Sequence, residues 1–275
     1  MLARFGKGVM RKAARHLRSK PFAMRNGAPL VSFSFDDVPE SAFTNGAAVL
    51  EDRGVRGTFY IAGGTCGGAD AHWRVIGRDQ VRALHERGHE IGCHTFSHVG
   101  VDTLDAAGAE RECRQNLNLL RGLCGDIDVR NFCYPFGRAS LSRKLQLQKR
   151  FDSCRGIYEG INAGTIDLGM LRVIELYDRT LTGEKLGRVL RETRERNGWL
   201  IFYTHDVAAE PSWIGCSPRL LRTTVEAVQA LGMPCLTVRD ALTEIGYAAA
   251  ENSAYRDQRL GESGKTLAFD HGVGK

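Results

Sequence analysis

A chain of 275 residues with 43% hydrophobic and 25% charged residues has the composition of an ordinary globular protein, with enough apolar side chains for one sizeable core. No apolar run approaches the roughly 20 residues that a membrane-spanning helix needs, which excludes a transmembrane helix. The net charge of +6 arises in the first 25 residues, and this concentration argues against a broad nucleic-acid-binding face on the folded body.

The first predicted element is a basic amphipathic helix within an N-terminal extension, residues 1–28. Apolar residues recur along it at helical spacing, namely Leu2, Phe5, Val9, Ala13 and Leu17. Two interpretations stay open: a helix lying on an anionic membrane surface, or a helix packed on its own domain or extended into solvent. Because the segment lacks the apolar core of a secretory signal, we expect a cytoplasmic protein, in peripheral contact with the membrane on the first interpretation.

Residues 29–247 are predicted to form one α/β domain in which strands alternate with helices. Apolar runs predict strands at 30–35, 57–62, 90–93, 130–134, 170–176, 199–204 and 235–238. Helical periodicity predicts helices at 41–53, 78–87, 105–123, 139–150, 183–196 and 218–231. This alternation indicates a parallel sheet, open or closed into a barrel, whose site lies at the C-terminal ends of its strands. Residues 248–275 are predicted to be a polar tail.

Eight cysteines are spread along the chain, and no Cys-x-x-Cys pair occurs among them. Neither a structural zinc knuckle nor a dithiol redox site is therefore predicted. In a chain of this length without an export signal, we expect reduced and mostly buried thiols rather than disulfides.

Two adjacent carboxylates, Asp36 and Asp37, directly follow the first buried strand. Side chains of neighbouring strand residues point in opposite directions, so both can face one cavity only where the backbone turns. Two carboxylates in one site can divide their roles, with one binding a cation and the other accepting a proton. Taken alone, the pair is a weak signal, and a loop cap beside a solvated acid explains it better.

Three histidines follow strands in the same manner. His94 and His98 are four residues apart, the spacing at which two imidazoles can bind one zinc ion, and Thr95 and Ser97 between them could fix the imidazole tautomers. With one Asp they would form a three-ligand site, which is the open type found in catalysis. His205 ends the strand at 199–204 and suits a general acid near neutral pH, or else a core position.

In combination, four motifs resemble the polysaccharide deacetylases, also known as the NodB-homology or carbohydrate esterase family 4 domain. The resemblance covers about residues 29–240. The motifs are Phe-Ser-Phe-Asp-Asp-Val-Pro at 33–39, His-Thr-Phe-Ser-His at 94–98, Phe-Cys-Tyr-Pro-Phe-Gly at 132–137 and Phe-Tyr-Thr-His-Asp at 202–206.

The resemblance implies a distorted (β/α) barrel and a metal-dependent hydrolase that removes N-acetyl groups from sugars. It assigns one divalent ion, most commonly Zn²⁺, to Asp37, His94 and His98. Asp36 would be the catalytic base and His205 the catalytic acid.

The third motif would supply the contacts to the substrate and the oxyanion, through Tyr134, Pro135 and Phe136. The resemblance assigns the oxyanion to the backbone N–H of Phe136, because proline has no N–H to offer.

Three features depart from the family pattern. Val38 stands where a glycine usually follows the two aspartates, and Cys133 stands where an arginine usually orients the base. No clear Asp-x-x-Asp-Trp element is found, which elsewhere helps to set the acid histidine. Arg172, on a later predicted strand, could take over an orienting role or form a surface salt bridge.

The expected substrate is an N-acetylated carbohydrate, specifically a lipid-linked or nucleotide-linked precursor of a surface glycan or lipopolysaccharide. One alternative is another amidohydrolase on the same scaffold, which removes formyl groups or opens small cyclic amides. The other is a non-catalytic sugar-binding or scaffold protein, which the retained Asp36 and His205 argue against.

Overall fold

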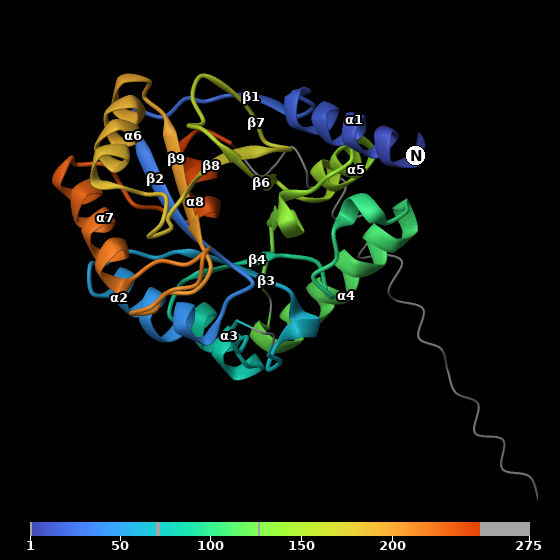
Figure 1. The fold of residues 1–275 in the computed structure, drawn as a ribbon, viewed down its shortest axis with the longest axis horizontal. Helices are drawn as coiled ribbons and strands as arrows, with labels where there is room; N and C mark the ends of the chain where they lie inside the picture. The colour runs from blue at the N-terminus through green and yellow to red at the C-terminus, as the bar shows by residue number, and fades with distance from the viewer. Residues whose placement is uncertain (1, 70–71, 126, 248–275) are drawn as a thin grey trace, which may run out of the picture.

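Seven parallel strands close into a barrel in the computed structural model, which describes residues 2–69, 72–125 and 127–247 (Figure 1). In order around the barrel they are β2 (Leu30–Asp36), β3 (Thr58–Ile61), β4 (Glu90–Cys93), β5 (Asn131–Cys133), β6 (Ser153–Glu159), β8 (Leu171–Glu175) and β9 (Trp199–Thr204). The predicted (β/α) barrel is thereby confirmed. The predicted tail, residues 248–275, lies outside the described residues.

Helices surround the barrel, as Figure 1 shows. They are α1 (Leu2–His16), α2 (Ala48–Glu51, entered through a π-helical turn at Ala42–Ala47), α3 (Arg78–Glu86), α4 (Ala106–Cys124), α5 (Leu141–Arg150), α6 (Gly183–Glu195), α7 (Pro218–Ala230) and α8 (Val238–Glu244). Five of them begin after a capping side chain whose oxygen accepts a hydrogen bond from a backbone N–H three residues later: Asp105, Ser140, Thr182, Ser217 and Thr237. Such caps are encoded locally in the sequence and fix where each helix starts.

The core is formed by strands that are buried on both faces, as expected for a parallel sheet covered by helices. Phe35 of β2 stacks on Phe59 of β3 with ring centroids 4.6 Å apart, and Phe33 stacks on Phe202 of β9 at 5.6 Å. Burial of each such ring stabilises the fold by ~1.5–3 kcal/mol. This aromatic packing holds the strand ends that carry the polar residues.

Three strands were not predicted, and one predicted strand is wrong. β1 (Pro21–Ala23) pairs antiparallel with β7 (Thr165–Asp167) beside the barrel, and β6 is a barrel strand in its own right. The predicted strand at 235–238 makes only a single bridge, between Val31 and Cys235, before α8 begins. The short apolar run there predicts a strand wrongly, because a buried strand and the start of a buried helix have the same apolar composition.

The N-terminal helix α1 packs beside α5. Lys144 of α5 is fully buried, and its ammonium group donates to the carbonyls of Ala14 (2.7 Å) and Leu17 (2.6 Å) while pairing with Asp167 at 2.5 Å. Arg11 forms a salt bridge with Asp102. These contacts correspond to the interpretation of a helix packed on its own domain.

Two further sequence-based expectations concern the membrane and the thiols. Within the described part of the chain, none of the helices combines the length and the apolar character that crossing a bilayer requires. All eight cysteines are free thiols, and five of them are buried.

Candidate active site

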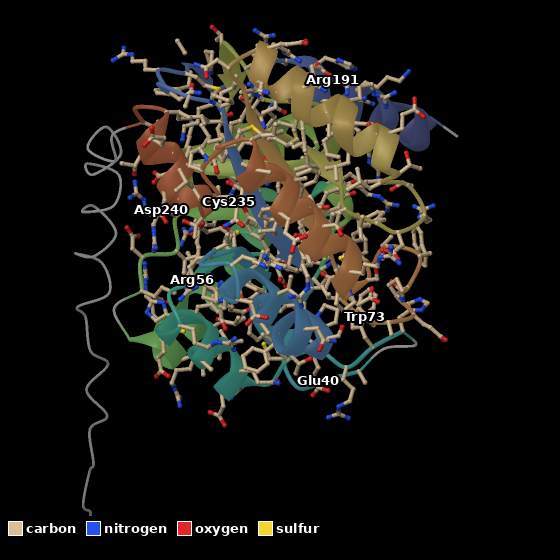
Figure 2. The ribbon with its side chains drawn as sticks, turned by 90° about the vertical axis from the view of Figure 1, so that its left-hand side faces the viewer. Glu40, Arg56, Trp73, Arg191, Cys235 and Asp240 are labelled. Carbon is tan, nitrogen blue, oxygen red and sulfur yellow. The ribbon has the colours of Figure 1, made fainter. Side chains whose placement is uncertain are left out.

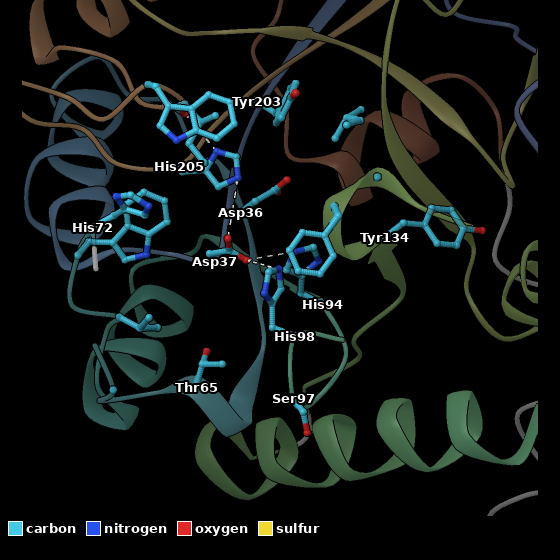
Figure 3. Close-up of a pocket in the computed structure, with 18 of the residues that line it drawn as sticks. Asp36, Asp37, Thr65, His72, His94, Ser97, His98, Tyr134, Tyr203 and His205 are labelled. Carbon is cyan, nitrogen blue, oxygen red and sulfur yellow. Dashed lines mark hydrogen bonds and ion pairs between the residues drawn. The ribbon is translucent and has the colours of Figure 1, made fainter. Parts of the chain in front are cut away.

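The polar residues that follow the strands converge at one end of the barrel, where they line a cavity of about 950 Å³. Figure 3 shows Asp36, Asp37, His94, His98 and His205 grouped there. Asp36 ends β2, His94 follows β4, and His205 follows β9. Parallel strands bring their C-terminal ends to one edge of a barrel, which is why residues so distant in sequence meet.

The backbone turns sharply after β2, so that both aspartates reach the cavity. Asp37 has φ = 58° and Val38 has φ = 47°, and the Val38 N–H donates to the Asp36 carbonyl at 2.5 Å. Positive φ is a strained conformation for a β-branched residue, and such strain clusters at functional sites. The structure thus explains why the family pattern has glycine at this position, and Val38 adopts the same backbone at an energetic cost.

Asp37, His94 and His98 form a triad whose potential ligand atoms lie within 4.8 Å of one another. The Asp37 Oδ1 atom is 2.9 Å from His98 Nε2 and 3.3 Å from His94 Nε2. This buried oxygen nevertheless makes no hydrogen bond of acceptable geometry, as expected for ligands arranged around an ion rather than paired with each other. One carboxylate and two imidazoles are a donor set suited to a divalent ion such as Zn²⁺, so the residues fit the implied metal.

The chemistry of the triad is set by its neighbours. The Nδ1–H of His94 donates to the Cys133 carbonyl at 2.8 Å, so its Nε2 is free to act as a ligand. Burial disfavours the charged form of Asp37, but contacts with His94 and His98 outweigh it and hold the pKa of Asp37 well below its usual range. Asp37 is therefore ionised at neutral pH, the form in which a carboxylate can bind a cation.

Thr95 and Ser97, expected to fix the imidazole tautomers of His94 and His98, make other contacts in the structure. Among the described residues, no hydrogen bond joins Thr95 to an imidazole, and its Oγ1 accepts from the Val99 N–H at 3.3 Å and so shapes the loop. The Ser97 N–H donates to Glu112 of α4 at 2.8 Å. The acceptor that fixes an imidazole tautomer is the Cys133 carbonyl, a backbone group that the sequence pattern does not reveal.

Asp36, the base that the family resemblance implies, is buried and paired with Arg155 of β6, which is fully buried. The guanidinium of Arg155 lies over the rings of Tyr60 (4.8 Å) and Tyr203 (5.2 Å). Arg155 is the direct register partner of Cys133 on the neighbouring strand β5. The orienting arginine that the family places at the position of Cys133 is therefore supplied here from the next strand.

Cys133 makes the second contact to the base. Its Sγ lies 3.5 Å from the Oδ2 atom of Asp36, and burial raises the pKa of the thiol. Cys133 is thus a neutral S–H donor to Asp36. Arg155 and Cys133 together hold both carboxylate oxygens of the base.

Arg172 does not have the orienting role considered for it. Its guanidinium donates to the Glu159 carbonyl at 3.2 Å at an exposed position, and Asp36 is paired with Arg155 instead. The available sequence signal was an arginine inside the short segment Ser-Cys-Arg-Gly-Ile-Tyr, which could have been recognised only if β6 had been predicted.

His205 presents its Nε2 to the cavity. Its Nδ1–H donates to the Ile214 carbonyl at 3.2 Å, and Nε2 lies 4.0 Å from Asp37 Oδ2 (Figure 3). Asp206 binds the N–H and hydroxyl of Ser212 instead of the imidazole. A carbonyl oxygen thus takes the orienting place for which the family uses its Asp-x-x-Asp-Trp element.

The third motif bends at Phe136, which has φ = 57° and is 51% exposed. Among the described residues, nothing accepts a hydrogen bond from its N–H, so this donor is available to an oxyanion. Tyr134 donates its hydroxyl to the Gly169 carbonyl at 3.1 Å, and Figure 3 shows its ring turned away from Asp37. Pro135 is buried and opens the turn.

Comparisons with known proteins find similarity to carbohydrate deacetylases. A sequence model of the family described as polysaccharide deacetylase matches residues 23–152. A chitin deacetylase from Pestalotiopsis sp. is 31% identical over 96 residues, 35% of this chain and 30% of that protein. A chitooligosaccharide deacetylase from Sinorhizobium fredii is 29% identical over 126 residues, 44% of this chain and 53% of that protein. The chain thus spans about a third to a half of the length of these relatives.

A solved structure shares the fold. A family 4 acetyl xylan esterase from Clostridium thermocellum, in complex with a cobalt ion, matches with a TM-score of 0.56 at 20% identity, over 78% of this chain and 90% of that one. The barrel and its site define a (β/α)-barrel protein with an Asp-His-His triad. The family match over residues 23–152 then confirms the resemblance to the polysaccharide deacetylases.

Proposed function

We propose that the protein is a metal-dependent hydrolase that removes the N-acetyl group from a sugar. One observation carries the proposal: the Asp37, His94 and His98 triad lies beside an arginine-paired carboxylate, Asp36, and a cavity-facing imidazole, His205. Amide hydrolysis needs these three functions together, because water must be activated, the oxyanion stabilised and the amine leaving group protonated.

The triad would hold a divalent ion, and Zn²⁺ suits its nitrogen and oxygen ligands best. When bound, such an ion polarises the amide carbonyl and lowers the pKa of a water molecule at the same centre. Asp36, fixed by Arg155, accepts a proton from the attacking water as the new C–O bond forms. Its burial and its pairing keep it oriented toward the cavity.

Phe136 and His205 complete the reaction. The Phe136 N–H donates to the oxyanion of the tetrahedral intermediate. His205 can carry a second proton on Nε2 while its Nδ1–H remains bonded to Ile214. Nε2 donates that proton to the amide nitrogen as the C–N bond breaks, which releases acetate and the free sugar amine.

The proposed substrate is an N-acetylated precursor of a surface glycan or lipopolysaccharide. Support comes from the exposed aromatic side chains at the cavity, Phe136 and Trp213, which suit stacking against sugar rings. The cavity is also within the size range of small-molecule sites, about 300–1,000 Å³.

His98→Ala is expected to lower the metal content from about one divalent ion per chain to near zero, because two remaining ligands hold zinc poorly. Metal content is measured by atomic spectroscopy after dialysis against zinc. The matched control is His72→Ala, since His72 also lines the cavity but lies outside the triad. Equal metal content in wild type and His98→Ala would refute the ligand assignment.

A further inference from the structure

Two arginines stand at the mouth of the cavity and have no assigned role. Arg138 and Arg179 both line it, and both are exposed. The guanidinium of Arg138 lies over the Phe136 ring at 5.5 Å. That of Arg179 lies over Tyr177 at 5.8 Å and over Trp213 at 5.1 Å. Aromatic contacts of this kind orient a guanidinium while leaving its N–H groups available.

Neither arginine is neutralised by the protein. Among the described residues, no carboxylate forms a salt bridge with Arg138 or Arg179, and no acceptor binds the N–H groups of their guanidinium side chains. By contrast, the carboxylate of Asp36 is already paired with Arg155. Once Asp37 binds a cation, Glu175 is the one carboxylate left among the described lining residues to oppose the two guanidinium groups. The mouth of the loaded cavity therefore carries excess positive charge.

The two arginines flank the reacting groups. Phe136, under Arg138, contacts the ring of His98 with centroids 4.6 Å apart. Tyr177, under Arg179, contacts the ring of His205 at 6.1 Å. One guanidinium thus adjoins the metal triad and the other adjoins the acid. A sugar whose amide lies between His98 and His205 would bring its neighbouring substituents within reach of these groups.

We propose that the sugar substrate carries an oxyanion group, a phosphate or a carboxylate, which Arg138 and Arg179 bind at the cavity mouth. The proposal rests on the proposed deacetylase function and narrows its substrate class. Arginine suits this task because its planar donors match the geometry of phosphate and carboxylate oxygens. A neutral polymer such as chitin would leave both guanidinium groups without a counter-charge.

The test compares acetate release from a neutral N-acetylglucosamine glycoside with release from N-acetylglucosamine 1-phosphate and from an N-acetylated hexosaminuronic acid. The zinc-loaded protein is expected to favour one of the anionic sugars by at least ~10-fold in kcat/KM, as expected for charge-assisted hydrogen bonds. Which of the two anionic sugars is favoured shows whether the arginines bind a phosphate or a carboxylate. R138Q/R179Q is expected to remove this preference, so that the ratio of kcat/KM for the anionic sugar to kcat/KM for the neutral sugar falls to about 1.

The matched control is Arg191→Gln, which removes an exposed arginine of α6 that does not line the cavity (Figure 2). This variant is expected to keep the preference for the anionic sugar. Equal kcat/KM for neutral and anionic sugars in the wild type, or a preference that survives in R138Q/R179Q, would overturn the proposal.

A binding measurement separates this proposal from the deacetylase function. Glucose 1-phosphate has no amide, so its binding, followed by calorimetry against glucose, does not depend on turnover. We expect R138Q/R179Q to weaken it by at least ~10-fold and Arg191→Gln to retain it. If no sugar releases acetate while this pattern holds, the deacetylase proposal fails and the anion site stands. If R138Q/R179Q binds glucose 1-phosphate as the wild type does, the anion site is refuted.

Discussion

Asp36→Asn is expected to lower kcat by roughly 10²–10⁴-fold, the range for loss of general-base catalysis. Asparagine keeps the shape of the side chain and a carbonyl oxygen for Arg155, but it cannot accept the proton of the attacking water. Because Asp37, His94 and His98 are unchanged, the zinc content should stay at about one ion per chain. The measurement is acetate release at saturating substrate, together with metal analysis of the same sample.

Two controls show whether the loss of activity in Asp36→Asn comes from loss of the base. The midpoint of thermal unfolding shows whether Asp36→Asn is folded, and His205→Gln removes the acid while leaving the base in place. We expect the His205 variant to lose most activity toward substrates with poor leaving groups. Turnover close to wild type in Asp36→Asn would favour a non-catalytic or differently acting protein.

Arg155→Ala is expected to destabilise the fold by about 3–5 kcal/mol, because it leaves the buried carboxylate of Asp36 without its charge partner. The variant should also lose most of its activity, since the base would no longer be held toward the cavity. Stability is measured by denaturant unfolding and activity by acetate release.

Exchanging two residues tests whether Arg155 acts by positioning Asp36 or only by packing in the core. Cys133 and Arg155 are register partners on β5 and β6, so Cys133→Arg combined with Arg155→Cys returns the arginine to the position of the family pattern. We expect this double variant to recover much of the stability and activity that Arg155→Ala loses. Activity as low as that of Arg155→Ala, in a folded double variant, would contradict the role of Arg155 in holding Asp36.

The two histidines of the triad could be predicted from local signals, whereas the choice of Asp37 over Asp36 as its carboxylate came from the family resemblance. His94 and His98 are four residues apart, and Asp37 directly follows an apolar strand. The rule that parallel strands carry their sites at their C-terminal ends then placed the three residues together, and the structure brings them within 4.8 Å. The helix predicted at 218–231 likewise begins where α7 does, directly after the capping residue Ser217.

Arg155 could not be predicted, because its role depends on a strand without a clear pattern. β6 contains a glycine, an arginine and a shift in register against β8, and its second half is partly exposed. No apolar run or strict alternation therefore identifies it. Its pairing with Cys133 is a contact between separate segments, which only the closed barrel defines.

The most direct test of the account is acetate release by the purified protein from N-acetylated sugars before and after removal of its metal. The assay uses neutral and anionic sugars, first with the zinc-loaded protein, then after chelation, and finally after zinc is restored. We expect acetate release that falls to background on chelation and returns with about one equivalent of zinc. Acetate release that is unaffected by chelation, or none from any sugar with the triad fully loaded, would contradict it.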